Sequence, residues 1–278
     1  MSSPVPNLIL NNGVEIPQLG FGVFKIPPEE TRQAVLRALG VGYRHIDTAK
    51  LYDNETAVGA AVRESGLVRE EIFVTTKLWN SDQGYDATLR AFDASMERLG
   101  LETLDMYLVH WPTPARDKYV ETWRAMEKLY VDGRIRAIGV SNFQPDHLRR
   151  LLDKSSVVPV INQIELHPYL QQNEARKAHD ELGVLTEAWG PLARGRSLLE
   201  DPVITGLADK HGRTPAQVVL RWHIELGNVV IPKSVTPSRM QDNFDIFDFA
   251  LDEEDVAAVA ALDRGGRTGP DPDKFNGS

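Results

Sequence analysis

Cysteine is absent from the 278-residue sequence, and this absence excludes several kinds of site. Without thiols the chain cannot form disulfides, thiolate metal centres or a cysteine nucleophile. The seven histidines show no His-x-x-x-His or comparable pairing. We therefore expect no metal site of the common ligand spacings.

Segments that would direct the chain into or across a membrane are also lacking. No apolar run approaches the roughly 18 residues that span a bilayer. The start, Met1-Ser2-Ser3-Pro4, has neither the basic region nor the apolar core of a secretory signal. The expected location is cytoplasmic.

Positive charge is in deficit, because 31 Lys and Arg stand against 40 Asp and Glu and give a formal net charge of −9. A nucleic-acid-binding surface needs a basic stripe that neutralises phosphates. An anionic membrane surface would repel such a chain in the same way. We therefore expect neither nucleic acid nor a membrane as a partner.

What the sequence does contain is a regular alternation of short apolar runs and amphipathic segments. Residues 85–99, for example, carry apolar side chains at helical spacing and are followed by Gly100, which stops a helix. Strands that alternate with helices predict a parallel sheet. Eight strands over this length predict a single domain, residues 1–278, with the (β/α)₈ TIM barrel fold, which needs about 250 residues. The predicted strands are Leu19–Phe24, Tyr43–Ile46, Ile72–Thr76, Leu104–Val109, Ile135–Val140, Val158–Ile161, Val184–Ala188 and Val229–Ile231.

Two segments lie outside this alternation. Residues 8–16 predict a β-hairpin with an Asn-Gly turn before the barrel. The tail, residues 264–278, is rich in Gly, Pro and Asp and is expected to be a loop over the barrel rim. A doubly wound open sheet is the alternative fold. Residues Gly20-Phe21-Gly22 lie inside a predicted strand, however, and do not fit the glycine-rich turn of that fold.

Polar or aromatic side chains follow seven of the predicted strands. In a barrel these positions share the C-terminal rim, where the active sites of this fold are found. One polar residue after a strand is weak evidence, but seven in register can serve one site. They are Asp47, Lys77, His110, Ser141-Asn142, Asn162-Gln163, Trp189 and Lys233-Ser234.

Three of these residues, Asp47, Lys77 and His110, together with Tyr52 five positions after Asp47, suit the reduction of a carbonyl group. With an ordinary pKa near 10, Tyr52 can donate a proton to a developing alkoxide at neutral pH. The Lys77 ammonium would lower that pKa, and Asp47 would keep the lysine charged and oriented. His110 could hydrogen-bond the carbonyl oxygen. On the residues alone, a purely structural Asp47–Lys77 ion pair stays open.

Three motifs make the chain similar to the aldo-keto reductase family. Residues 42–49, Gly-Tyr-Arg-His-Ile-Asp-Thr-Ala, resemble the first family signature, and residues 136–143 resemble the second. Residues 231–234, with Arg239 and Asn243, match most of the third. The Trp189-Gly190 pair, with residues 21–25 and 78–80, is most similar to bacterial 2,5-diketo-D-gluconate reductases.

The resemblance implies an NADPH-dependent reductase, acting as a monomer on a small carbonyl compound. Hydride would pass to the carbonyl carbon of an aldehyde, ketone or dicarbonyl, with keto sugar acids among the candidates. Tyr52 is implied as proton donor, Lys77 and Asp47 as the pair that tunes it, and His110 as the group that orients the substrate. The residues implied to contact the substrate are Phe24, Trp79, His110 and Trp111.

The resemblance also implies where the cofactor binds. Ser141, Asn142 and Gln163 would bind the nicotinamide carboxamide, and Trp189 would stack on the ring beside Gly190. The other residues implied are Leu192, Arg194 and Gly195 for the pyrophosphate, Lys233, Ser234, Val235 and Arg239 for the 2′-phosphate end, and Asp242 and Asn243 for the adenine. Arg196 adds positive charge near Arg194.

Two positions depart from the family pattern. Trp189 stands where most of the family has tyrosine, but it keeps an aromatic face for stacking. Asp242 stands where glutamate is usual, and its shorter side chain reaches less far toward the adenine.

Two other functions stay open. A Schiff-base aldolase would use Lys77 as its nucleophile, which requires a lowered lysine pKa. A non-catalytic NADPH-binding regulator could keep the phosphate-binding residues and lose the catalytic ones, whereas this chain has all four.

Overall fold

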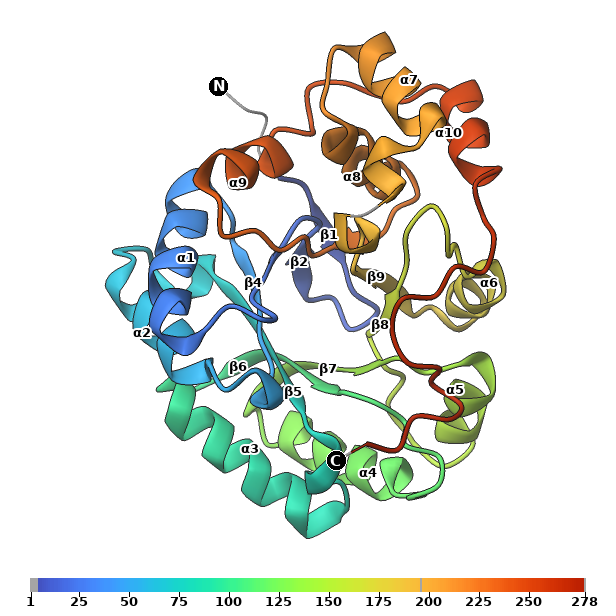
Figure 1. Ribbon diagram of the computed structural model, residues 1–278. Helices are drawn as coiled ribbons and strands as arrows, with labels where there is room; N and C mark the ends of the chain where they lie inside the picture. The colour runs from blue at the N-terminus through green and yellow to red at the C-terminus, as the bar shows by residue number, and fades with distance from the viewer. Residues whose placement is uncertain (1–4, 196, 278) are drawn as a thin grey trace.

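In the computed structural model, which describes residues 5–195 and 197–277, eight parallel strands form one sheet in the order β10-β9-β8-β7-β6-β5-β4-β3. Leu19, just before β3, bridges in parallel to Val230 of β10, so the first and last strands meet and the sheet closes into a barrel (Figure 1). The predicted (β/α)₈ barrel is confirmed. The strands are β3 (Phe21–Gly22), β4 (His45–Asp47), β5 (Phe73–Leu78), β6 (Leu104–Val109), β7 (Ile135–Ser141), β8 (Ile161–Glu165), β9 (Leu185–Trp189) and β10 (Val229–Val230).

Helices surround the barrel, and at least one separates each strand from the next. Proline occupies the first turn of α1, α5, α7, α8 and α9, where its missing N–H costs no hydrogen bond. Of these helices, α10 was not anticipated from the sequence. The helices are α1 (Pro28–Val41), α2 (Glu55–Glu64), α3 (Tyr85–Leu99), α4 (Tyr119–Val131), α5 (Pro145–Leu152), α6 (Asn173–Leu182), α7 (Pro202–His211), α8 (Pro215–Glu225), α9 (Pro237–Phe244) and α10 (Glu253–Ala260).

Alternation along the strands sorts the core into two layers. In β6, Tyr107 and Val109 pack in the layer beneath the helices, whereas Met106 and Leu108 belong to the cluster that fills the barrel interior. The hairpin of β1 (Asn7–Ile9) and β2 (Glu15–Pro17) packs on this interior cluster and closes one end of the barrel. The predicted hairpin is therefore confirmed.

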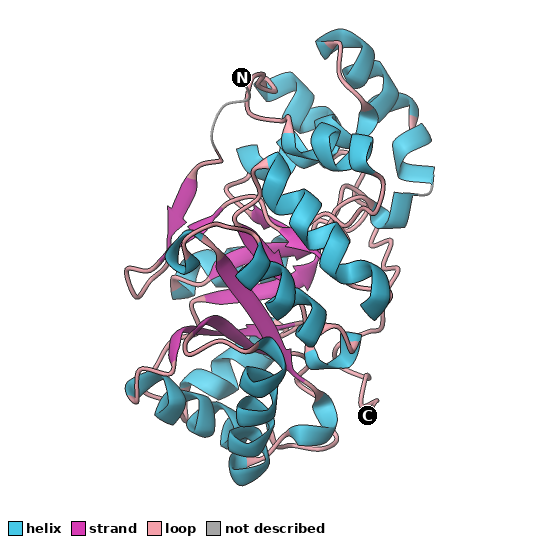
Figure 2. Ribbon diagram, turned by 90° about the vertical axis from the view of Figure 1, so that its left-hand side faces the viewer, coloured by secondary structure: helices cyan, strands magenta, loops and turns pink. Residues whose placement is uncertain are grey.

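The C-terminal tail crosses the opposite end of the barrel, as Figure 2 shows from the side. Glu165, at the end of β8, accepts hydrogen bonds from Thr268 N at 2.7 Å and Gly269 N at 2.9 Å. Further along, Asn80 donates to Gly277 O at 2.8 Å. The expected loop over the rim is thus anchored at the C-terminal ends of two different strands, β8 and β5. In the part of the chain described, no helix is long and apolar enough to cross a membrane.

The sixth predicted strand is misplaced by several residues. The sequence pattern favoured Val158–Ile161, but the strand is Ile161–Glu165. Val158 is 38% exposed in the preceding loop, and the polar residues Asn162 and Gln163 lie inside the strand, where each is hydrogen-bonded. The prediction rested on an apolar run as the sign of a buried strand. These two polar amides are buried instead because other parts of the barrel accept their hydrogen bonds. Lys77 likewise lies within β5 and does not follow it.

Candidate active site

A buried ion pair lies where β4 and β5 end. Lys77 Nζ donates to the two carboxylate oxygens of Asp47 at 2.7 and 2.8 Å and to Thr48 O at 2.9 Å. Both side chains are almost completely buried. Because the ammonium group and the carboxylate are hydrogen-bonded, their burial is tolerated, and removal of one partner would cost about 3–5 kcal/mol.

Tyr52 lies at the end of a short 3₁₀ helix, Lys50–Tyr52, that follows β4. Its hydroxyl is 3.4 Å from Lys77 Nζ, and the ammonium also lies 5.1 Å from the centre of its ring. On the other side, the ring of His110, at the end of β6, is 5.8 Å away between centroids. The four residues predicted from the strand ends therefore meet in one cluster.

The pKa of Tyr52 moves opposite to the simple expectation. Burial raises it, the Lys77 ammonium lowers it, and the Asp47 carboxylate raises it again, so that the net direction is upward. Lys77 thus limits the rise in the Tyr52 pKa that burial causes, but it does not bring that pKa below its usual value. Burial lowers the pKa of Lys77, but Asp47, together with Tyr52 and Glu187, outweighs burial and raises that pKa, so the side chain stays an ammonium.

His110 is held neutral. Burial, and secondly the Lys77 ammonium, lower its pKa well below 6.5. Its Nδ1 atom is buried without a hydrogen-bond partner in the described chain. A neutral imidazole carries one N–H, so His110 can donate a hydrogen bond to a carbonyl oxygen without titrating near neutral pH.

The residues expected at the nicotinamide form a connected group beside this cluster. Ser141 Oγ donates to Gln163 O at 2.8 Å, and Trp189 Nε1 donates to Asn142 Oδ1 at 2.8 Å. Asn142 has a left-handed backbone, with φ of 62°, and its Nδ2 donates to His110 O at 3.0 Å. The Trp189 indole is therefore fixed relative to His110 through Asn142, and Trp189 stays partly exposed.

The residues expected at the phosphates lie farther along the same rim. Lys233 and Arg239 are exposed, before and within the first turn of α9, and neither forms an ion pair with a residue that the structure describes. Ser234 is buried, and Val235 is 41% exposed. Of the remaining predicted contacts, Arg194 and Gly195 are exposed in the loop after β9, Leu192 and Gly190 are half-buried there, Asp242 is half-buried on α9, and Asn243 is buried. Arg196 lies outside the described residues.

Aromatic side chains pack beside Tyr52 and His110. Phe24 packs on the Tyr52 ring, with 4.9 Å between centroids, and Trp79 packs on His110 at 5.1 Å. Trp111 is buried against Phe275 of the tail at 4.6 Å. Of the four predicted substrate contacts, Phe24 and Trp79 therefore lie against Tyr52 and His110, and Trp111 directly follows His110 in the chain. The contact of Phe275 with Trp111 was not predicted, because the tail was expected over the rim without any signal for which of its residues would face the site.

Two buried glutamates were also missed. Glu187 on β9 lies beside Gln163, and burial, followed by the Asp47 charge, raises its pKa to about 8. Burial alone would raise the pKa of Glu165, but hydrogen bonds from His167 and Thr268 outweigh it and lower that pKa to about 2. The available signal was a glutamate near the end of each of two successive apolar strands.

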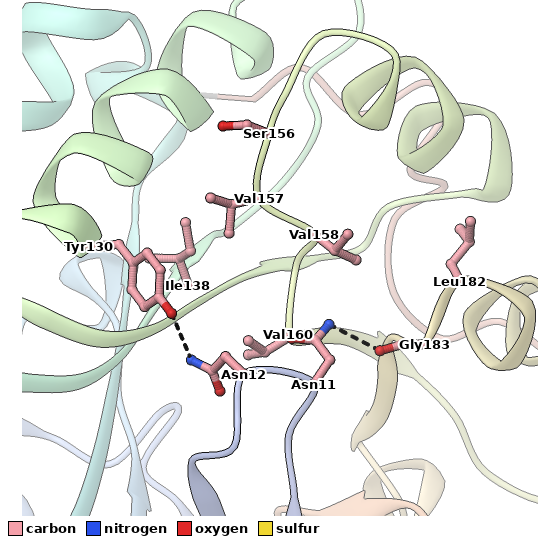
Figure 3. Close-up of a pocket in the computed structure, with 10 residues that line it drawn as sticks. All are labelled: Asn11, Asn12, Tyr130, Ile138, Ser156, Val157, Val158, Val160, Leu182 and Gly183. Carbon is pink, nitrogen blue, oxygen red and sulfur yellow. Dashed lines mark hydrogen bonds between the residues drawn. The ribbon is translucent and has the colours of Figure 1, made fainter.

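A surface cavity of about 390 Å³ lies away from this chemistry. Its lining includes Asn11 and Asn12 of the hairpin turn, which donate to Gly183 O and to the Tyr130 hydroxyl (Figure 3). These segments belong to the barrel end closed by the hairpin, and the cavity lining includes no charged side chain. We assign the active site to the opposite end, where the titratable groups converge. No group of three potential metal ligands occurs among residues 5–195 and 197–277.

The sequence profile described as "Aldo/keto reductase family" matches residues 18–264. An aldo-keto reductase of Mycolicibacterium smegmatis is 59% identical over 98% of both chains. Glyoxal reductase of Bacillus subtilis is 52% identical over 96% of both chains. Methylglyoxal reductase DkgA of Salmonella typhimurium is 50% identical over 98% of this chain and 99% of its own length.

The fold comparison agrees with the sequence comparison. The crystal structure of a Gox0644 mutant in complex with NADPH superposes with a TM-score of 0.94 at 48% identity, covering 98% of this chain and 99% of that one. The profile match spans nearly the whole barrel, and the relatives align end to end. The chain belongs to the aldo/keto reductase family.

Proposed function

We propose that this protein is an NADPH-dependent reductase of small α-dicarbonyl compounds and related aldehydes and ketones, with Tyr52 as the proton donor. The observation that carries the proposal is the cluster of Asp47, Tyr52, Lys77 and His110. It combines a phenol, a permanent positive charge 3.4 Å from the phenolic oxygen and a neutral imidazole. These three groups are sufficient to orient a carbonyl oxygen and to protonate it as an alkoxide forms.

The cofactor fits the residues present. Lys233 and Arg239 are exposed cations beside the first turn of α9, where backbone N–H groups also favour a phosphate. Trp189 presents a partly exposed indole held by Asn142. The bound NADPH of the Gox0644 mutant supports the choice, at 48% identity and near-complete coverage.

Proton transfer follows from the charges around Tyr52. When bound, NADPH supplies the hydride that reduces the carbonyl carbon. The carbonyl oxygen gains negative charge as this happens, and the His110 N–H stabilises that charge by a hydrogen bond. Tyr52 donates its proton to the same oxygen and becomes a tyrosinate, which the adjacent Lys77 ammonium stabilises. Water then restores the Tyr52 proton after the product alcohol leaves.

The surroundings of the cluster favour a small uncharged substrate. Phe24, Trp79 and Trp111 supply apolar contacts, and His110 is neutral, so the site offers orientation by packing and by one hydrogen bond. The glyoxal and methylglyoxal reductases among the relatives act, by name, on compounds of this size. Keto sugar acids, which carry a carboxylate, are the alternative substrates.

Substitution of Tyr52 by phenylalanine tests the proposal. A positioned general acid contributes about 10²–10⁴-fold to rate. Oxidation of NADPH in the presence of methylglyoxal, followed by absorbance, should fall by this factor in Tyr52→Phe, while the dissociation constant of NADPH stays within about two-fold. A panel with glyoxal, methylglyoxal and a keto sugar acid ranks the substrate classes. Near-normal turnover by the phenylalanine variant would exclude Tyr52 as the donor.

The Schiff-base alternative receives no support from the geometry. An aldolase lysine attacks as a neutral amine and needs a lowered pKa. Here the Asp47 carboxylate raises the pKa of Lys77 and occupies its N–H groups. The regulator alternative predicts that NADPH is bound but not consumed, which the same assay detects.

A further inference from the structure

Glu187 is a completely buried acid that the proton-transfer steps do not use. It stands on β9 in register with Gln163 on β8, which is itself in register with Ser141 on β7. The three side chains therefore occupy the same level of the barrel, next to Asp47. Such a carboxyl group is costly to bury, so its contacts are informative.

The Gln163 amide lies between two acids. Its Nε2 atom donates to Asp47 Oδ2 at 2.8 Å and to Glu187 Oε2 at 3.0 Å. A primary amide has two N–H groups, and both are thereby used. If the amide were turned around, its oxygen would face two carboxyl oxygens. The two acids consequently fix which end of the amide points away from them.

The end that points away is the carbonyl oxygen, Oε1. Within the described chain, no group donates to this atom, and it is not among the buried atoms that lack a partner. The neighbouring amide of Asn142 is already engaged, because Nδ2 donates to His110 O and Ser141 Oγ and Oδ1 accepts from Trp189. Gln163 Oε1 is thus the acceptor that this group of residues leaves for a ligand.

We propose that Glu187 is a positioning residue for the cofactor: together with Asp47 it holds the Gln163 amide so that Oε1 accepts a hydrogen bond from the N–H₂ of the nicotinamide carboxamide. This rests on the proposed function, in which Gln163 binds that carboxamide. The role needs an acceptor oxygen and not a negative charge. A protonated carboxyl group or a glutamine at position 187 still offers one.

The test uses two cofactors that differ in the relevant donor. NADP⁺ carries the carboxamide, whereas 3-acetylpyridine adenine dinucleotide phosphate has a methyl group in place of the N–H₂. Dissociation constants of both are measured by calorimetry for the wild type, Glu187→Ala and Glu187→Gln. We expect Glu187→Ala to weaken NADP⁺ binding by about five-fold, the scale of one neutral hydrogen bond, and to leave the analogue unchanged. Glu187→Gln should restore NADP⁺ binding to within two-fold.

A matched control separates positioning from folding. Glu55 is another buried glutamate, on α2, paired with Arg98 outside the barrel. Glu55→Ala should lower stability but leave the ratio of the two dissociation constants at the wild-type value. Since the readout is a ratio, a smaller folded fraction does not distort it. In the Gln163→Ala background, Glu187→Ala should have no further effect on that ratio.

Two results would overturn the inference. In the first, Glu187→Ala weakens both cofactors equally, as a merely structural residue would. In the second, neither cofactor is affected. If wild-type protein bound neither cofactor, the proposed function itself would fail, and the positioning role would fail with it. Wild-type binding combined with an unchanged ratio in Glu187→Ala refutes the positioning role alone.

Discussion

Replacement of Lys77 by methionine is expected to slow carbonyl reduction by about 10²–10³-fold. Two unit charges 3.4 Å apart, the distance between Lys77 Nζ and the Tyr52 oxygen, interact by about 5 kcal/mol at an effective dielectric constant of 20. Tyr52 carries only part of a unit charge in the transition state, so we expect about 2.7–4.1 kcal/mol of this energy to be lost. Each 1.36 kcal/mol is about ten-fold in rate.

The pH profile gives an independent signature of the same charge. In the proposed mechanism, reduction requires protonated Tyr52 and is lost as pH rises through the tyrosine pKa. The Lys77 ammonium lowers that pKa, whereas burial and Asp47 raise it. Without the ammonium the pKa is higher, so the alkaline loss of kcat should move to higher pH. In the reverse oxidation, which requires tyrosinate, the rise in rate should move to higher pH as well.

A control is needed because Lys77→Met leaves the Asp47 carboxylate buried without its ion-pair partner. The double variant Asp47→Asn/Lys77→Met removes both charges, and it should unfold closer to the wild-type urea concentration than Lys77→Met alone. It should still reduce methylglyoxal slowly. A loss of less than ten-fold in both variants, or an alkaline limb that does not move, would refute the assignment of Lys77 as the charge that supports Tyr52.

Three further predictions concern the tail, the packing of the helices and the cofactor. Glu165 has its pKa lowered from 4.5 to about 2, so its contribution to stability is present above pH 4.5 and is lost as pH falls toward 2. At pH 7, Glu165→Gln should accordingly lower the free energy of unfolding by up to about 3 kcal/mol. This difference should shrink below pH 4.5, which urea titrations at several pH values can measure. A Cβ on Gly59 would lie 1.8 Å from Leu99 O, so Gly59→Ala should destabilise the protein by more than about 2 kcal/mol. At Gly40 no atom lies within 4 Å of such a Cβ, so Gly40→Ala should be neutral or stabilising in the same urea assay. Arg239→Ala should weaken NADPH by about ten-fold or more and leave NADH unchanged in fluorescence titrations, and equal losses for both cofactors would contradict a 2′-phosphate contact.

The barrel could be anticipated because its strands and helices are local patterns that repeat. Residues 85–99, for instance, form α3 with the bounds expected from their spacing. The sixth strand was wrong because its burial does not follow hydrophobicity: Asn162 and Gln163 are buried because Phe143 O, after β7, and Asp47, on β4, accept their hydrogen bonds. Such pairing depends on contacts between distant parts of the chain.

The site shows the same division. Asp47, Tyr52, Lys77 and His110 could be placed together because the barrel brings strand ends to one rim, and the cluster is as expected. The direction in which the Tyr52 pKa shifts could not be predicted from the sequence. Burial of the phenol raises this pKa and the nearby Lys77 ammonium lowers it, and the balance depends on the depth of burial and on the distance to Lys77. The contact of Phe275 with Trp111 could not be predicted either, because the tail was expected over the rim but has no periodicity from which the contacts of one residue follow.

The bridge between Leu19 and Val230 has a consequence for synthesis of the chain. While the ribosome is still producing the second half, β3 can pair with β4 on one side, but its other edge waits for β10. An unpaired strand edge is a template for aggregation, and pairings between distant residues form slowly. Truncations that end before Val229 should therefore be insoluble even though they retain Asp47, Tyr52, Lys77 and His110.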